Sequence, residues 1–237
     1  MPFLEIIQLK MSKKTTEETD VIIDVQEVYS KSETFIEDNK KIISIILLGI
    51  IAVIALYFGY KKLYIAPMEI EAQSQMFMAE KYFEQDSLQK AIYGDGLNYG
   101  FVDIVADYSG TKSANLAHYY LGICYRNTGE YELAIDELKS FSSSDVMVSA
   151  VALGAIGDSY MELSDFGNAI NYYEKAASHQ ENELTSPIYR FKAGLACEEN
   201  NDYTAALENY NRIKEDYPDS REAQTIDKYI ARAEALK

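Results

Sequence analysis

Hydrophobic residues are concentrated in one uninterrupted stretch, Ile42 to Tyr60, which holds nineteen residues and no charge. As a helix it would be about 28 Å long, at roughly 1.5 Å per residue, which is close to the hydrocarbon thickness of a bilayer. Ile, Leu, Val and Phe fill twelve of these positions, and each favours insertion by about 0.3 to 0.6 kcal/mol. A buried core helix is the alternative, but such helices rarely lack polar residues so completely. The pattern predicts a single transmembrane helix over residues 42–60.

Lysine pairs flank the predicted span, at positions 40–41 before it and 61–62 after it. A long segment precedes the span and no small-residue cleavage site follows it, so we expect an uncleaved anchor rather than a signal peptide. Lys31 gives the N-terminal side a small excess of lysine, and a long domain after an anchor can be translocated whatever its charge. We expect the N-terminus in the cytoplasm and the residues after 62 outside.

Residues 1–41 are mostly polar, and Met11 is a second candidate for the start of the protein. From Val21 apolar residues recur at roughly helical spacing, which predicts a short amphipathic helix over residues 21–39 of this cytoplasmic segment. Two interpretations stay open: the helix lies on the bilayer surface, or it docks on the cytoplasmic face of another membrane protein.

After the span the chain repeats a pattern of small and aromatic residues with constant internal spacing. The shared positions are a glycine (Gly122, Gly157, Gly194), an aromatic residue nine positions later (Tyr131, Phe166, Tyr203), an alanine twelve later (Ala134, Ala169, Ala206) and a Leu or Tyr sixteen later (Leu138, Tyr173, Tyr210). The copies start 35 and 37 residues apart, so length varies only between units. Each unit is therefore expected to be rigid, with loops as joints.

The residue types predict two helices joined by a turn in each unit. A glycine on the first helix and an alanine on the second permit close approach, and the larger residues fill the space between neighbouring units. The skeleton resembles the tetratricopeptide repeat, and Pro218 falls where that repeat has its closing proline. The resemblance implies an all-α solenoid over residues 66–237, with repeats at 115–148, 150–183 and 187–220.

Two weaker elements complete the predicted solenoid. Residues from Phe101 parallel those from Tyr210, with Tyr108 matching Tyr217, so we expect a degenerate unit over 69–114 in which Glu69 to Phe83 form the partner helix. The open end of a solenoid needs a polar cover, so residues 221–237 are expected to form a capping helix.

Charge narrows the classes of partner. Lys and Arg number 22 against 38 Asp and Glu, a net charge of −16, and residues 63–237 alone carry 14 basic and 29 acidic side chains. So acidic a chain is unsuited to bind a nucleic-acid backbone. Two cysteines do not build a disulfide framework. Cys124 and Cys197 lie in units a whole repeat apart, so we expect two buried free thiols.

A search for catalytic or ligand-binding motifs finds none. The glycines from Gly94 to Gly100 lack dinucleotide-loop spacing, so a flexible joint is expected there. His118 and His179 are the only histidines and have no ligand partners at metal-site spacing, so His118 is expected to pack within its repeat. We therefore expect no enzyme activity, no metal, no cofactor and no small-molecule substrate.

The order of short cytoplasmic helix, single anchor and acidic repeat domain is similar to that of the bacterial YfgM-like family, described as ancillary subunits of the SecYEG translocon. The resemblance covers nearly the whole chain. It implies the bacterial inner membrane as location, a periplasmic repeat domain beside the translocon, and the transfer of secreted chains to periplasmic chaperones. A scaffold for cell-envelope assembly or division is the alternative function.

In the tetratricopeptide repeat the first helices line the concave surface. The positions that the resemblance assigns to that surface, and that we expect to contact a partner, are Tyr119, Ile123, Arg126, Asn127, Asp158, Met161, Glu162, Phe191, Leu195, Glu198 and Glu199. Their aromatic and aliphatic side chains with an acidic rim suit an amphipathic or extended segment that carries basic residues. The alternative is that several of them merely pack against the neighbouring unit.

Overall fold

The computed structural model describes the backbone of residues 25–237 and the side chains from residue 36 onward. Throughout this part the chain is helical, without a strand, which confirms the all-α prediction. Contacts divide the chain into two units, with the boundary between Phe58 and Gly59. The helices are α2 (Val25–Tyr60), α3 (Ala66–Glu84), α4 (Leu88–Tyr93), α5 (Phe101–Asp107), α6 (Lys112–Thr128), α7 (Tyr131–Ser140), α8 (Val146–Glu162), α9 (Phe166–Ser178), α10 (Thr185–Glu199), α11 (Tyr203–Asp216) and α12 (Ile226–Leu236).

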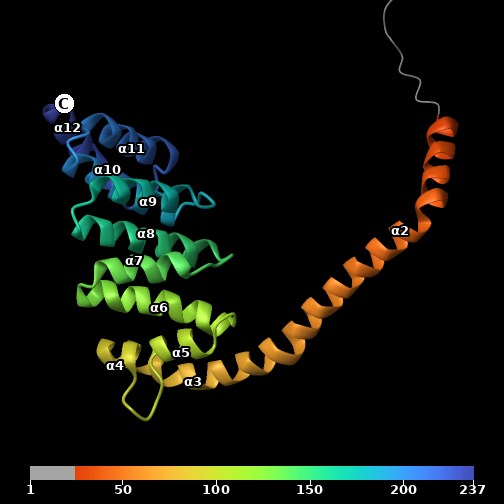
Figure 1. Cartoon of the computed structure of the whole chain (residues 1–237). Helices are drawn as coiled ribbons and strands as arrows, with labels where there is room; N and C mark the ends of the chain where they lie inside the picture. The colour runs from red at the N-terminus through yellow and green to blue at the C-terminus, as the bar shows by residue number, and fades with distance from the viewer. Residues whose placement is uncertain (1–24) are drawn as a thin grey trace, which may run out of the picture. The chain divides into compact units, whose positions relative to one another are not determined.

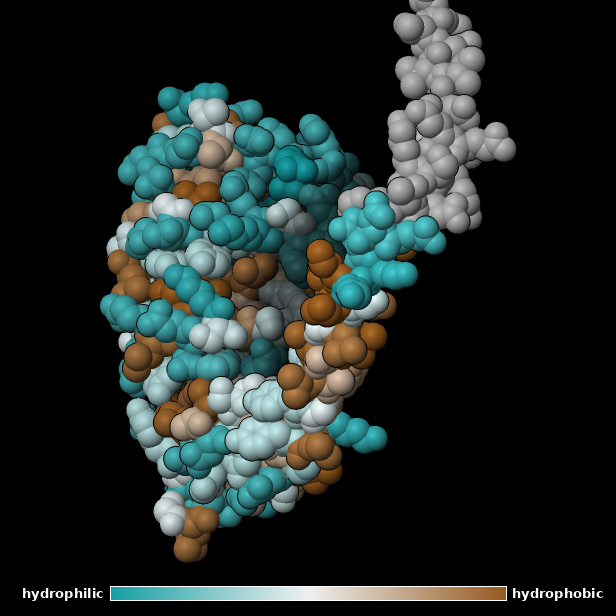
Figure 2. Space-filling model, turned by 45° about the vertical axis from the view of Figure 1, so that its right-hand side comes forward, coloured by the Kyte–Doolittle hydropathy of each residue, from teal (hydrophilic) through white to brown (hydrophobic). Residues whose placement is uncertain are grey.

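Helix α2 contains the whole predicted span. Its apolar side chains are exposed: Ile45, Leu48 and Leu56 each keep at least 70% of their surface. Figure 2 shows many brown, apolar atoms along the segment that continues from the grey residues. Among the described residues this is the one helix long and apolar enough to cross a membrane.

In the part that the structure describes, no separate helix precedes the span. Residues 25–39 of the predicted amphipathic helix belong to α2 itself, and residues 21–24 lie outside the described part. The helix continues past residue 40 because no proline or glycine, the residues that most often interrupt a helix, occurs between Val25 and Gly49.

A π-helical segment, Lys61–Ile65, joins α2 to α3. Pro67, in the first turn of α3, accounts for it. Proline has no N–H to donate to the carbonyl four residues earlier, here that of Leu63, and its ring crowds that carbonyl. A π-type turn is one way in which a helix accommodates such a local break in its hydrogen bonds.

Beyond this joint, helix pairs stack in sequence order (Figure 1). The predicted repeats correspond to the pairs α6–α7, α8–α9 and α10–α11, and each pair contacts the next. The first helices of neighbouring pairs also meet, α6 with α8 and α8 with α10.

Glycines set the close approach within each pair, as the sequence predicts. A Cβ atom on Gly157 would lie 2.7 Å from the ring of Tyr173, and one on Gly194 would lie 2.2 Å from the ring of Tyr210. In the first pair a Cβ on Gly122 would lie 2.4 Å from the Leu138 side chain. In each pair the glycine of the first helix therefore packs against a large residue of the second helix, which lies sixteen positions later in the sequence.

The segment before these repeats follows the same register. Asp86, Gly129, Ser164 and Asn201 all have positive φ angles, and each lies two residues before the second helix of its unit. Counting from Asp86 places Ala79 and Ala91, both fully buried, where the other units have their glycine and alanine. The second helix of this first unit is divided into α4 and α5, because six extra residues separate Asp86 from Phe101 relative to Asn201 and Tyr210.

The extra residues form a loop with several hydrogen bonds to Asp95. One carboxylate oxygen of Asp95 accepts hydrogen bonds from the N–H groups of Leu97 and Asn98, and the other accepts the Tyr82 hydroxyl at 2.6 Å. The Tyr82 bond is the main cause that lowers the pKa of Asp95. Leu97 stands 94% exposed on this loop.

Helix α12 covers the last pair, where the capping helix was expected. Its Ile226 and Ala233 are buried against Tyr210 and Ile213 of α11 and Cys197 of α10. Tyr229 of α12 packs edge-on against Phe191 of α10, with ring centroids 4.7 Å apart.

Candidate protein-binding surface

An open pocket of about 500 Å³ lies across the three predicted repeats. It is lined by residues of five consecutive helices: Arg126, Asn127, Tyr131, Asp158, Met161, Glu162, Tyr173, Lys192 and Leu195. The helices α6, α8 and α10 supply seven of the nine, so the pocket belongs to the surface of the first helices.

Asp158 is the electrostatic centre of the pocket. Its Oδ1 accepts the Tyr173 hydroxyl at 2.8 Å and the Lys192 ammonium at 2.7 Å, and its Oδ2 accepts Arg126 at 3.1 Å. Arg126 comes from the preceding repeat and Lys192 from the following one. One carboxylate thus connects all three repeats, and it pairs with a cation from each neighbouring repeat.

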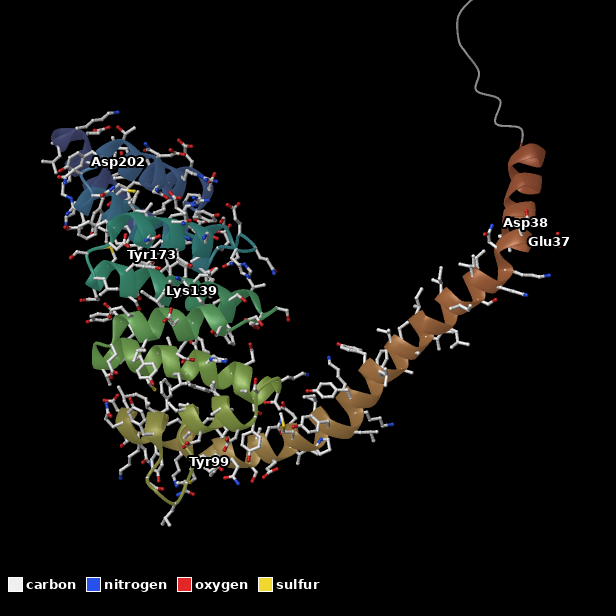
Figure 3. All side chains as sticks on the ribbon, in the orientation of Figure 1. Glu37, Asp38, Tyr99, Lys139, Tyr173 and Asp202 are labelled. Carbon is white, nitrogen blue, oxygen red and sulfur yellow. The ribbon has the colours of Figure 1, made fainter. Side chains whose placement is uncertain are left out.

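Tyrosine positions this carboxylate. Burial, together with the charge of Asp158, raises the pKa of Tyr173, so its hydroxyl stays protonated and donates to Asp158. Figure 3 labels Tyr173 within the stack of helix pairs. Burial and the same charge raise the pKa of Tyr189 to about 12. The Tyr189 ring fits against α8 only because residue 154 is glycine, since a Cβ there would lie 2.0 Å from it.

Around this polar centre Met161, Leu195 and Tyr131 are each only half-buried. Glu162 is exposed and accepts a long, 3.4 Å hydrogen bond from the Tyr131 hydroxyl. The pocket therefore offers apolar side chains beside a satisfied ionic cluster, with one acidic group at its edge.

Comparison with known proteins agrees with this geometry. Two family models described as tetratricopeptide repeat match residues 116–144 and 155–221. The chain carries tetratricopeptide repeats. Surfaces of this kind bind other proteins, and neither the models nor the site offers a sign of catalysis. No curated protein matches the sequence at a significant level.

Two solved structures share the fold. One is described as a putative kinesin light chain from Podosopora anserina with nearly identical TPR-like repeats, and the other is a single-substitution form of the same protein. They are 14% and 15% identical, have a TM-score of 0.52, and the match covers 70% of this chain and 86% of theirs. At such identity the likeness shows the fold alone.

The structure divides the predicted contact residues between the pocket, the exposed surface outside it and internal packing. Six of the eleven line the pocket across the tetratricopeptide repeats: Arg126, Asn127, Asp158, Met161, Glu162 and Leu195. Glu199 is exposed outside it. Partner binding at these positions stays a prediction.

The other four are used for internal packing. Ile123 is buried with Ile156, and Tyr119 packs against Phe141 at 5.2 Å. Phe191 is covered by Tyr229, and Glu198 accepts Arg232 at 2.6 Å. Phe191 and Glu198, both of the third repeat, are unavailable to a partner for the same reason: α12 covers the surface on which they lie.

Three pocket residues, Tyr131, Tyr173 and Lys192, were not among the predicted contacts. For Lys192 the sequence did contain a signal. Lys192 lies two residues before Gly194, and Asp158, of opposite charge, lies one residue after Gly157 on the first helix of the preceding repeat. Tyr173 was expected only to fill space, but its hydroxyl reaches the pocket.

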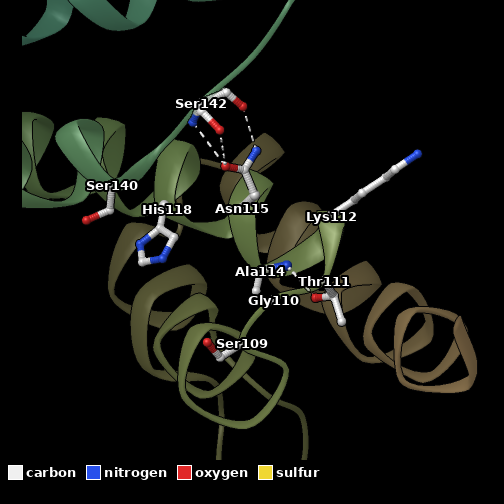
Figure 4. A pocket seen from close by; sticks show the side chains of 9 residues that line it. All are labelled: Ser109, Gly110, Thr111, Lys112, Ala114, Asn115, His118, Ser140 and Ser142. Carbon is white, nitrogen blue, oxygen red and sulfur yellow. Dashed lines mark hydrogen bonds between the residues drawn. The ribbon is translucent and has the colours of Figure 1, made fainter. Parts of the chain in front are cut away.

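A second pocket, of about 480 Å³, lies at the start of α6 (Figure 4). Its serines, Lys112 and the helix N-terminus resemble an anion site. However, Glu69 of α3 already accepts the N–H groups of Lys112 and Ser113, at 2.6 and 3.3 Å, and the Ser113 hydroxyl. His118 is held by Glu137 at 2.6 Å, in agreement with a packing role. The first N–H groups of α6, which an anion would need, are therefore in use.

Other chemistry finds no support in the described residues. No group of three or more His, Cys, Asp or Glu side chains there could hold a metal ion. Cys124 and Cys197 are free and buried, as expected, and burial raises the pKa of each thiol to about 12, so neither is a reactive thiolate at neutral pH.

Proposed function

We propose that this protein is a membrane-anchored adaptor of the Sec translocon that holds its tetratricopeptide repeats in the periplasm and passes emerging chains to periplasmic chaperones. The observation that carries the proposal is the pocket on the first helices, which presents apolar side chains around Asp158. The described residues also include a helix long and apolar enough to cross a membrane. The similarity in segment order to the YfgM-like family supplies the translocon as the partner.

The pocket favours an extended segment with apolar side chains and a nearby basic residue. Asp158 pairs with both Arg126 and Lys192, and Glu162 is the second carboxylate of the pocket, so the two acidic groups balance the two cations. A basic residue of the bound segment can pair with Glu162, which is exposed. Residues 63–237 carry a net charge of −15, which attracts such a segment and repels acidic chains.

Site-specific photo-cross-linking in native membranes tests the proposal. A benzophenone amino acid at Met161 in the full-length protein should cross-link to translocon subunits or periplasmic chaperones. The matched control carries the same group at Asn171, an exposed residue of α9 that does not line the pocket. Equal labelling from both positions, or envelope-assembly proteins in place of secretion proteins at Met161, would contradict the proposal.

Orientation needs its own experiment. In sealed, inside-out inner-membrane vesicles, added protease should leave residues 63–237 intact and remove the N-terminal segment. Degradation of the repeats without detergent would place them in the cytoplasm and exclude the periplasmic role.

A further inference from the structure

A third cavity lies between the last two repeats, separate from the pocket around Asp158. It measures about 290 Å³ and is lined by residues of α9, α10 and α11 and of the loop between α9 and α10. None of these residues lines the Asp158 pocket. Arg190 belongs to the cavity and Lys192 to the pocket, and residues two positions apart on a helix do not face the same way. The repeats therefore have two distinct polar sites.

Arg190 is a buried cation in the wall of this cavity. Only 4% of its surface is exposed, and its Nη2 donates to Oε1 of Glu181 at 2.8 Å. Its Nε is buried and has no hydrogen-bond partner among the residues that the structure describes. A buried donor without an acceptor is unfavourable and rare in native proteins. The Nε–H of Arg190 is thus a donor that a bound molecule can use.

The charges of the lining favour a cation over an anion. Three glutamates, at positions 174, 181 and 208, accompany two arginines, at positions 190 and 212, so the net charge is −1. Both arginines lie against Glu181, with nitrogen atoms 2.8 and 3.7 Å from its Oε1. Within the described part of the chain Glu174 and Glu208 form no ion pair. An anion would be repelled by these two carboxylates, whereas a cation would be attracted.

Glu174 of α9 and Glu208 of α11 approach the same part of α10, which lies between their helices. Burial, followed by the charges of Glu174, Asp202 and Glu208, raises the pKa of the Cys197 thiol to about 12. Both carboxylates therefore lie near this thiol. They are not placed to bind a metal ion, since no group of three or more His, Cys, Asp or Glu side chains in the described residues could hold one.

The size of the cavity limits what it can hold. Its volume of about 290 Å³ lies at the lower limit of the roughly 300 to 1,000 Å³ of sites that enclose a whole small molecule. One long side chain and the peptide group beside it suit this volume better.

We propose that this cavity, the Arg190 cavity, binds a lysine or arginine side chain of an extended polypeptide. The basic group lies between Glu174 and Glu208, and a backbone carbonyl next to it accepts the Nε–H of Arg190. One basic residue brings the net charge of the lining to zero, and a free amine would lack the carbonyl. The inference goes beyond the proposed function, because an adaptor that holds one chain at the Asp158 pocket can hold a second polypeptide here.

NMR of the arginine side chains in the full-length, detergent-solubilised protein tests the proposal. The chain has five arginines, so the Nε–H resonance of Arg190 can be assigned from its loss in Arg190→Lys. The probe is a pentapeptide with blocked termini and one central lysine among alanine and serine residues. It should shift the Arg190 resonance in a saturable way and leave that of Arg221, which lines neither site, in place. The same peptide with norleucine instead of lysine should bind about tenfold more weakly, because it loses a charged contact.

Two double variants separate the cavity from the overall negative charge. Glu174→Gln with Glu208→Gln should weaken binding of the lysine peptide about tenfold. Glu215→Gln with Asp219→Asn removes the same charge from exposed positions outside the cavity and should have little effect. All four side chains are exposed, so circular dichroism should be unchanged in both variants.

Absence of a shift at Arg190, equal binding of the norleucine peptide, or an equal loss from the two double variants would overturn the proposal. A saturable shift of Arg190 by sodium acetate would also overturn it, because the arginines would then serve an anion. Arg126 reports on the Asp158 pocket in the same spectra, so a failure at Arg190 is distinguished from a failure of the proposed function.

Discussion

Each end of the repeat stack has an apolar helical surface, but the chain covers only the C-terminal one with a further helix. At the C-terminal end α12 buries Ile226 and Ala233 and takes up Phe191 and Glu198 of the last repeat. At the N-terminal end α3 leaves Ile70 and Phe77 in solvent. The difference teaches that one end is closed by the chain itself, whereas the other keeps an unpartnered apolar face.

The largest contrast between the ends is expected from one truncation made at each. Ile226→Ala removes a side chain that is 1% exposed and should lower the free energy of unfolding by about 2 to 5 kcal/mol. Ile70→Ala, on a side chain that is 72% exposed, should change it by less than about 0.5 kcal/mol. Urea titration in detergent measures both, and a similar loss from the two variants would refute the comparison.

The closed end also depends on the close approach of α10 and α11. Gly194→Ala places a methyl group against the ring of Tyr210, which has no exposed surface to move into, and should destabilise the domain by about 1 to 3 kcal/mol. Gly167→Ala on α9, where a Cβ meets no atom within 4 Å, should instead stabilise it by about 0.5 kcal/mol. Thermal unfolding of the two variants should shift in opposite directions.

At the open end the Glu69 carboxylate of α3 adds hydrogen bonds from the start of α6 to the apolar packing between the two helices. Burial alone would raise the pKa of Glu69, but hydrogen bonds from Ser113 and Lys112 outweigh it and lower the pKa below 4.5. The stabilisation is thus present above pH 4.5 and is lost as the pH falls through the lower, folded value. Glu69→Ala should cost about 1 kcal/mol at pH 7, as for a helix cap, and less at pH 3.

Hydrogen exchange locates this effect. Faster exchange in α3 and at the start of α6 at pH 7, with α10 to α12 unchanged, is the expected pattern for Glu69→Ala. Uniformly faster exchange along the stack would show that the open end is not a separate cooperative region.

The smallest effect is expected from surface ion pairs at the closed end. Arg232 pairs with Glu198, which is 12% exposed, whereas Lys214 pairs with Asp227, which is 77% exposed. Arg232→Ala should cost about 0.5 to 1 kcal/mol, and Lys214→Ala should have no measurable effect. Thermal midpoints at low and high salt compare the two pairs, and an equal loss would show that the burial of Glu198 is unimportant.

Much of the candidate site could be anticipated because each repeat places the same offsets on the same face. Arg126 and Met161 both lie four residues after the repeat glycine, and both line the pocket. Glu198 has the same offset, but α12 pairs it with Arg232. The offset predicts the direction of a side chain and not what the rest of the chain brings against it.

The sequence by itself determined the apolar span, the helix pairs and their glycine contacts, because hydrophobic runs and periodic spacing are local properties that any helical backbone expresses. Only the tertiary structure decided that Asp158 joins three repeats, that an inserted loop divides the second helix of the first unit into α4 and α5, and that Ile70 and Phe77 of α3 are left uncovered. Those features depend on which surfaces meet. That choice is made by packing between segments far apart in the chain, where spacing along the sequence carries no information.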